Sequence, residues 1–206
     1  MNYNNILGVV LAGGKSKRFG EDKNYVKLGD KTLLQHVLSK INNKFQEILI
    51  VSSNSLKIQK IKNITVIPDC LEGLGPLAGV LSSMKWVKEN KKSYKWVATF
   101  PSDTPFFDIS IIEEFEKKIK LHESSLYFVK SNNKRHNIFG LWSLDLLKTL
   151  EDDLLKNNFR KVEEWANKIG VKTIDVKINK FDPFFNINTK KDLEEAQNIL
   201  EEYKND

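Results

Sequence analysis

Cysteine is almost absent from this sequence, with Cys70 the only one among 206 residues. A single thiol forms no intrachain disulfide and supplies no cysteine cluster for a metal. Long apolar runs are missing too, since no stretch approaches the roughly 20 residues that a membrane-spanning helix needs. The first residues, MNYNN, lack the basic and then apolar pattern of a secretory signal peptide. We therefore expect a cytoplasmic protein without a membrane span.

Internal repeats, low-complexity tracts and long linkers are also lacking, and 206 residues suffice for one sizeable core. We therefore expect a single domain over residues 1–206. The net charge of +6 favours an anionic ligand. The lysines are spread along the whole chain, however, and no nucleic-acid-binding motif is present. The expected partner is thus a small anionic molecule rather than a nucleic acid.

Apolar segments of strand length alternate with segments of helical periodicity through most of the chain. Thr32 and Asp108 stand where each would cap a helix. The alternation predicts an α/β fold of three layers, α/β/α, with a mostly parallel sheet. The polar residues 131–136 are expected to form a hairpin loop, which interrupts this alternation of strands and helices. The expected strands cover residues 6–10, 47–51, 64–67, 95–100, 125–130, 137–142 and 171–178, and the expected helices cover residues 33–41, 56–61, 77–88, 109–121, 144–155, 159–169 and 190–203.

The segment 11–23, LAGGKSKRFGEDK, changes character directly after the first expected strand. Gly13 and Gly14 carry no side chains, so their backbone N–H groups would converge on an anion. Four cations and a third glycine follow in the same segment: Lys15, Lys17, Arg18, Lys23 and Gly20. Two standard phosphate-binding motifs, GxxxxGK[ST] and GxGxxG, are absent. The segment therefore indicates either a loop around a polyphosphate or an ordinary strand-to-helix turn with solvated lysines.

Polar residues follow the second, third and fourth expected strands as well. Residues 52–54 come after the second strand, Asp69 after the third and Asp103 after the fourth. In open α/β sheets, ligands bind outside the carboxyl ends of the strands. Polar and anionic groups at one edge, facing a cationic loop, therefore predict a site for a nucleotide and its metal.

Asp103 stands in FPSDTPF, where Pro101 and Pro105 stiffen the backbone on both sides. A carboxylate held in this way would bind Mg²⁺, which prefers hard oxygen ligands and usually keeps waters and phosphate oxygens. An aspartate between prolines also suits a plain turn or a helix cap. The residues alone leave both roles open.

Four segments match motifs of one family in residue type and spacing. They are residues 11–23 (LAGGxSxRxGxDK), 69–79 (DxxxGxGPLxG), 101–106 (PCDxPF, with Ser102 in place of the usual Cys) and 186–193 (NxNTxxDL). The chain thereby resembles the MobA-like nucleotidyltransferase family, which has a Rossmann-like fold, and within it the molybdenum cofactor guanylyltransferases. Residues 135–141 are also similar to a family stretch, but Asn137 stands where proline is common.

The resemblance implies GTP-dependent transfer of GMP to the terminal phosphate of molybdenum-bound molybdopterin, with release of pyrophosphate. It implies Mg²⁺ as the metal, held by Asp103, and three catalytic residues, Arg18, Lys23 and Asp103. The implied nucleotide-binding residues are Leu11, Ala12, Gly13, Gly14, Lys23, Ser53, Asn54, Asp69, Gly75 and Asp103. Those implied for molybdopterin are Arg160, Asn186 and Asn188.

Several of these residues also have purely structural interpretations. Asp69 would simply end a strand, and Asn188 or Thr189 would cap the last helix. Of the two asparagines near the C-terminus, Asn186 is therefore the better candidate for a ligand contact. The aromatic residues 181–185 would pack in the core rather than against a flat ligand ring.

GTP and molybdenum-bound molybdopterin are the expected substrates, and the same resemblance implies transient contact with cofactor-insertion proteins or molybdoenzyme chaperones. Two alternatives remain. An enzyme of the same fold would transfer CMP to molybdopterin, or a nucleotide to a sugar or alcohol phosphate, because the first loop and PSDTPF serve the triphosphate whichever base is bound. A non-catalytic regulator would bind nucleotide without turnover, although the joint presence of Arg18, Lys23 and Asp103 argues against it.

Overall fold

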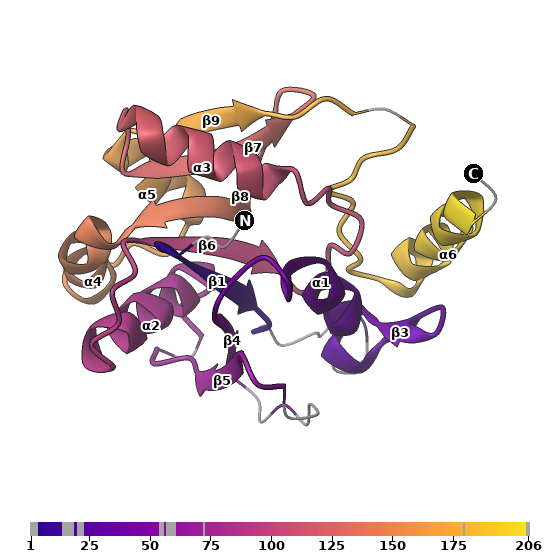
Figure 1. Cartoon of the computed structure of the whole chain (residues 1–206), viewed down its shortest axis with the longest axis horizontal. Coiled ribbons are helices and arrows are strands. Elements are labelled where there is room, and N and C mark those ends of the chain that lie inside the picture. Colours follow the sequence, from indigo (N-terminus) through magenta and orange to yellow (C-terminus); the bar gives the residue numbers. More distant parts are fainter. Residues whose placement is uncertain are drawn as a thin grey trace.

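Strands and helices alternate along the chain in the computed structural model shown in Figure 1. The structure describes residues 4–13, 19, 23–53, 56, 61–71, 73–178 and 180–204. The strands are β1 (Ile6–Leu11), β2 (Lys27–Leu28), β3 (Lys31–Thr32), β4 (Ile48–Ser52), β5 (Ile64–Pro68), β6 (Trp96–Pro101), β7 (Leu126–Ser131), β8 (Lys134–Ser143) and β9 (Lys172–Asp175). The helices are α1 (Leu33–Ile41), α2 (Pro76–Glu89), α3 (Ile111–Leu121), α4 (Leu147–Leu155), α5 (Val162–Ile169) and α6 (Lys190–Lys204), with short 3₁₀ turns η1 (Lys23–Tyr25) and η2 (Leu144–Leu146).

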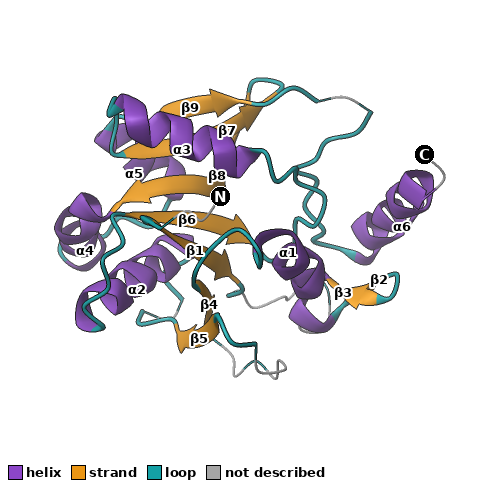
Figure 2. Ribbon diagram, in the orientation of Figure 1, coloured by secondary structure: helices purple, strands orange, loops and turns teal. Residues whose placement is uncertain are grey.

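A seven-stranded sheet in the order β5-β4-β1-β6-β8-β7-β9 forms the centre of the fold. Among the described strands of this sheet, β8 alone runs antiparallel to its neighbours, β6 and β7. Helices cover both faces of the sheet (Figure 2), so the expected mostly parallel α/β/α architecture is confirmed. None of the described helices is long and apolar enough to cross a bilayer.

The sheet separates two hydrophobic cores, because successive side chains of a strand point to opposite faces. On β1, Ile6 and Val10 pack with α1 and α3, whereas Leu7 and Val9 pack with α2, α4 and α5. A third cluster lies beyond the sheet, where α6 packs against the β2–β3 hairpin (Figure 1). This cluster fixes the last part of the chain beside the carboxyl end of the sheet.

The starts of α1 and α3 show where the local sequence does and does not predict a helix cap. Thr32 caps α1 as expected, since its hydroxyl accepts from the Gln35 N–H at 3.2 Å and the Gln35 side chain accepts from the Thr32 N–H at 2.8 Å. The prediction that Asp108 caps the next amphipathic helix is wrong. Its carboxylate instead accepts from the Ser110 N–H at 2.7 Å in a turn before α3 begins.

The hairpin between β7 and β8 is tighter than expected. Asn132 and Asn133 have positive φ angles of 44° and 60° and form a two-residue turn, so both strands extend into residues 131–136. The helix expected over residues 56–61 falls mostly outside the described residues. The strand expected over 171–178 and the helix expected over 159–169 shorten to β9 and α5.

Gly140 on β8 leaves no room for a side chain. A Cβ there would lie 2.7 Å from the Phe128 ring and 2.8 Å from Trp142 Nε1. Both rings are buried, and the indole donates to the Thr99 hydroxyl at 2.8 Å, which limits how far it can move. We expect Gly140→Ala to lower the free energy of unfolding by about 1–3 kcal/mol through overpacking. Urea denaturation measures this, and an unchanged midpoint would contradict it.

Candidate active site

The chain leaves β1 at the carboxyl edge of the sheet, between β4 and β6. The Ala12 N–H donates to the Val51 carbonyl at 2.9 Å, and the Ser102 N–H donates to the Leu11 carbonyl at 3.2 Å. The Ala12 N–H is therefore engaged within the sheet, whereas a Cβ added at Gly13 would have no atom within 4 Å. Three expected site residues lie outside the described residues: Gly14, Arg18 and Asn54.

Lys23 begins η1, which returns to the same edge. The neighbouring Asn24 is buried, and its amide donates to the Ala12 carbonyl at 3.0 Å, which fixes the backbone of this turn. The Lys23 Nζ atom lies 3.1 Å from Asp103 Oδ2 and donates to Asn188 Oδ1 at 2.6 Å. Three expected site residues from distant parts of the sequence thus meet at one point.

Asp103 follows β6 and is held through its backbone. Its carbonyl accepts from the Ile187 N–H at 2.9 Å, and the next residue, Thr104, is 1% exposed. The Asp103 carboxylate keeps 19% of its side-chain surface exposed. Since α3 begins only at Ile111, Asp103 caps no helix, and its carboxylate faces Lys23. The backbone of Asp103 is therefore held in place, while part of its carboxylate side chain stays exposed.

The start of α6 positions Asn188. The Thr189 hydroxyl accepts from the Asp192 N–H at 3.2 Å, while the Asp192 carboxylate accepts from the N–H groups of Asn188 and Thr189, both at 2.8 Å. Burial alone would raise the pKa of Asp192, but these hydrogen bonds and the nearby charge of Lys23 lower it below its usual value. Thr189 therefore caps the helix, and Asn188 reaches the site.

Asp69 and Gly75 lie on either side of the turn between β5 and α2. Asp69 Oδ1 accepts from the Leu71 N–H at 3.1 Å and lies 3.3 Å from the Ser82 hydroxyl of α2. Asp69 therefore does not merely end a strand, because its carboxylate is tied to the helix. Gly75 precedes α2 with φ +78°, a conformation that favours glycine. Its missing side chain leaves the backbone open at the N-terminus of this helix.

Gly79 explains why α2 lies so close to the sheet. A Cβ at this position would lie 2.9 Å from Leu11 Cδ2 and 3.7 Å from Val51 Cγ1. The last glycine of the DxxxGxGPLxG motif thus has a packing role, which the sequence did not assign. It brings the N-terminus of α2, the positive end of the helix dipole, next to the ends of β1 and β4.

The other expected residues are exposed. Ser53 follows β4 directly, and Asn186 lies two residues before Asn188. Arg160 lies in the segment between α4 and α5, where its guanidinium donates to the carbonyls of Leu154 at 2.8 Å and Phe159 at 2.7 Å. The guanidinium of Arg160 therefore lies at the C-terminal end of α4. Of the aromatic residues 181–185, Phe184 is buried in the core, as expected.

Asp103 is the candidate metal ligand. Groups of three or more His, Cys, Asp and Glu side chains that could hold an ion do not occur in the described part of the chain. One carboxylate nevertheless fits Mg²⁺, which is usually bound by one or two carboxylates together with substrate phosphates and waters. The oxygen that would bind the metal now contacts the Lys23 ammonium, so a cation already occupies one side of this carboxylate.

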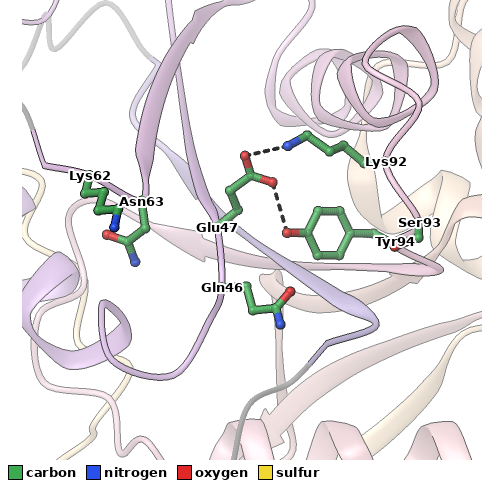
Figure 3. Close-up of a pocket in the computed structure, with 7 residues that line it drawn as sticks. All are labelled: Gln46, Glu47, Lys62, Asn63, Lys92, Ser93 and Tyr94. Carbon is green, nitrogen blue, oxygen red and sulfur yellow. Dashed lines mark hydrogen bonds and ion pairs between the residues drawn. The ribbon is translucent and has the colours of Figure 1, made fainter.

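A pocket of about 600 Å³ lies at the opposite edge, where the strands begin (Figure 3). Glu47 accepts from Lys92 Nζ at 2.8 Å and from the Tyr94 hydroxyl at 3.0 Å. Burial and the adjacent carboxylate raise the pKa of Tyr94, so the phenol stays protonated and donates. Both oxygens of Glu47 are thus engaged within the protein. The lining residues are Gln46, Glu47, Lys62, Asn63, Lys92, Ser93 and Tyr94.

Residues 8–169 match the MobA-like NTP transferase domain. The chain belongs to the MobA-like NTP transferase family. Among curated members of this family, the molybdenum cofactor guanylyltransferase of Rhizobium johnstonii is 33% identical over 98% of this chain and 96% of its own length. That of Rhizobium leguminosarum bv. trifolii is 34% identical over 95% of this chain and 93% of its own length. The family expected from the sequence motifs is therefore confirmed.

Solved structures show the same fold in other nucleotidyltransferases. The molybdopterin-guanine dinucleotide biosynthesis protein A of Archaeoglobus fulgidus superposes with a TM-score of 0.73 at 22% identity and covers 95% of this chain and 99% of its own. The 2-C-methyl-D-erythritol 4-phosphate cytidylyltransferase of Francisella tularensis has a TM-score of 0.69 at 21% identity, over 93% and 98% of the two chains. At these identities the likeness defines the fold and leaves the base and the acceptor open.

Proposed function

We propose that this protein transfers GMP from GTP to the terminal phosphate of molybdenum-bound molybdopterin and releases pyrophosphate. The observation that carries the proposal is the contact of Lys23 with Asp103 and Asn188 at the carboxyl edge of the sheet. The guanylyltransferases that align over nearly the whole chain support the choice of base and acceptor. A cytoplasmic location and transient contact with cofactor-insertion proteins or molybdoenzyme chaperones belong to the same proposal.

In this reaction an oxygen of the acceptor phosphate forms a bond to the α-phosphorus of GTP. The bond from that phosphorus to the oxygen bridging the β-phosphate breaks, and pyrophosphate leaves with the electron pair. The attacking phosphate is already anionic near pH 7, so the protein needs no general base. Its task is to hold the two reactants in line and to stabilise the charge that develops.

The residues of the site divide this task. Lys23 would bind phosphate oxygens and stabilise the leaving group, together with Arg18. Asp103 would hold Mg²⁺, which supplies charge neutralisation at the phosphates when bound. The backbone at Gly13 and Gly14 would bind phosphate, and Asp69 would contact the guanine or the ribose. The nucleotide site would be completed by Leu11, Ala12, Ser53, Asn54 and Gly75. The molybdopterin site would consist of Arg160, Asn186 and Asn188.

The choice of guanine is tested by thermal unfolding with each nucleoside triphosphate and Mg²⁺. We expect GTP at a hundredfold excess over its Kd to raise the Tm by about 5–10 °C, because a ligand that binds only the folded state stabilises it by about 2.7 kcal/mol. CTP, ATP and UTP at the same concentration should raise it less. A larger shift with CTP would favour CMP transfer instead.

Catalysis is tested by pyrophosphate release from GTP and Mg²⁺ with and without molybdenum-bound molybdopterin. Release that depends on the acceptor is expected. Nucleotide binding without any acceptor-dependent release would contradict the proposal and favour a non-catalytic regulator.

A further inference from the structure

Asp153 on α4 is a buried charge that the reaction does not use. It is 2% exposed, and within the described residues it is the only Asp, Glu, Lys or Arg that is buried. Three side chains donate to its carboxylate: Trp165 Nε1 at 2.9 Å, Asn157 Nδ2 at 2.7 Å, and Lys168 Nζ. Its own carbonyl accepts from the Phe159 N–H at 3.1 Å. Asp153 therefore connects α4, α5 and the segment between them.

The carboxylate is ionised in the folded protein. Burial alone would raise the pKa of Asp153, but the three side-chain donors outweigh it and lower the pKa below its usual value. A buried ion pair often stabilises a protein no more than apolar residues of the same volume would. Two features show instead that this carboxylate fixes the local geometry. Its donors come from the segment 157–161 itself and from the following helix α5, and Lys168 Nζ also lies 4.9 Å from the centre of the Phe159 ring.

The segment 157–161 is folded closely onto the end of α4. Asn158 has a positive φ of 55°, and its side chain accepts from the Arg160 guanidinium at 3.0 Å. The same guanidinium donates to the carbonyls of Leu154 and Phe159, where it also meets the negative end of the helix dipole. The segment is thus bonded to α4 through Asn157, Phe159 and Arg160.

This segment borders the turn that enters α2. The Arg160 carbonyl oxygen lies 3.9 Å from the position that a Cβ of Gly75 would occupy. Helices α2 and α4 pack side by side, and Lys85 on α2 pairs with Glu151 on α4 at 2.6 Å. A shift of the segment would therefore change the space above Gly75, where the nucleotide is proposed to bind.

We propose that Asp153 is a positioning residue for the nucleotide: its buried carboxylate holds residues 157–161 against the Gly75 turn and thereby fixes one wall of the GTP site. The inference rests on the proposed function, because it assumes that GTP binds beside Gly75. Asp153 itself touches neither nucleotide nor acceptor. Its effect should therefore appear in the affinity for GTP and not in the chemical step.

The test is a set of three variants of the full chain, assayed with GTP, Mg²⁺ and molybdenum-bound molybdopterin. Asp153→Asn removes the charge and places an amide, whose NH₂ group is itself a donor, opposite the three side chains that donate to the carboxylate. Asn157→Ala removes one bond to the segment and leaves the contacts of Trp165 and Lys168 in place. Glu151→Gln is the matched control, since it makes the same carboxylate-to-amide change on the same helix but pairs only with Lys85 in the contacts described above.

We expect Asp153→Asn to raise the KM for GTP and its Kd from calorimetry about tenfold, with kcat within about twofold of wild type. Asn157→Ala should raise both about threefold, and Glu151→Gln should leave both unchanged. Unaltered GTP affinity in Asn157→Ala, together with either unaltered affinity or failure to fold in Asp153→Asn, would make Asp153 purely structural and overturn the inference. An increase in the KM for molybdopterin with unaltered GTP affinity would also overturn it, because the segment would then act only at the acceptor, through Arg160, and not on the nucleotide. If the wild-type protein does not bind GTP at all, the proposed function itself fails.

Discussion

Asp103→Asn is expected to lower the rate of GMP transfer by about a hundredfold while the fold survives. The substitution removes the charge that would hold the metal at the phosphates, and the loss of such a contact costs about 3 kcal/mol in the barrier. The side chain is 19% exposed, and the carbonyl that accepts from Ile187 is unchanged, so the structure should persist. Acceptor-dependent pyrophosphate release measures the rate, and far-UV circular dichroism measures the fold.

Asp108→Asn is the matched control, because it makes the same change five residues further along the chain, where the carboxylate serves only a turn before α3 in the contacts described above. Its rate should stay within about twofold of wild type. A near-wild-type rate in Asp103→Asn would remove this carboxylate from the mechanism.

Lys23→Met is expected to have two opposite effects. Turnover should fall about a hundredfold, because the proposed role of the ammonium is to stabilise the leaving phosphates. Binding of Mn²⁺ without nucleotide should become about three- to tenfold tighter, because Lys23 Nζ lies 3.1 Å from Asp103 Oδ2 and competes with a metal for the same oxygen. Electron paramagnetic resonance of free Mn²⁺ measures the second effect without any turnover.

Lys27→Met serves as the control, since it removes a lysine of the same stretch that is exposed on β2. Neither turnover nor Mn²⁺ affinity should change. If Lys23→Met weakens Mn²⁺ binding, the lysine supports the metal site. The contact of Lys23 with Asp103 would then not compete with the metal.

The layered fold could be predicted from the sequence because each strand and helix carries its own periodic signal. Thr32 and the apolar positions of α1 form a local pattern, and they fold as that pattern indicates. The failure at the start of α3 comes from a second local contact that competes with the helix cap. Asp108 looks like a cap, yet its carboxylate is used by Ser110 in a turn, and the helix begins later.

The sequence motifs predict which residues belong to the candidate site, but they do not predict which of these residues contact one another. Lys23 and Asp103 stand in recognisable segments, but their pairing depends on the path of the chain between them. The sequence favours Asn186 over Asn188 as a ligand contact, because Asn188 also suits a helix cap. That role falls instead to Thr189 with Asp192, and this frees Asn188 for Lys23. The buried bond from Asn24 to Ala12 carries no motif, so the sequence offered no signal for it.

The contact of Lys23 with Asp103 spans 80 residues, and its contact with Asn188 spans 165. On the ribosome, every strand of the sheet therefore emerges before Asn188 does, since β9 ends at Asp175. A chain that ended between β9 and Asn188 would contain the whole sheet and the pair of Lys23 and Asp103, but it would lack the asparagine that also contacts Lys23. The contact of Lys23 with both Asp103 and Asn188 therefore forms only after residue 188 has been translated.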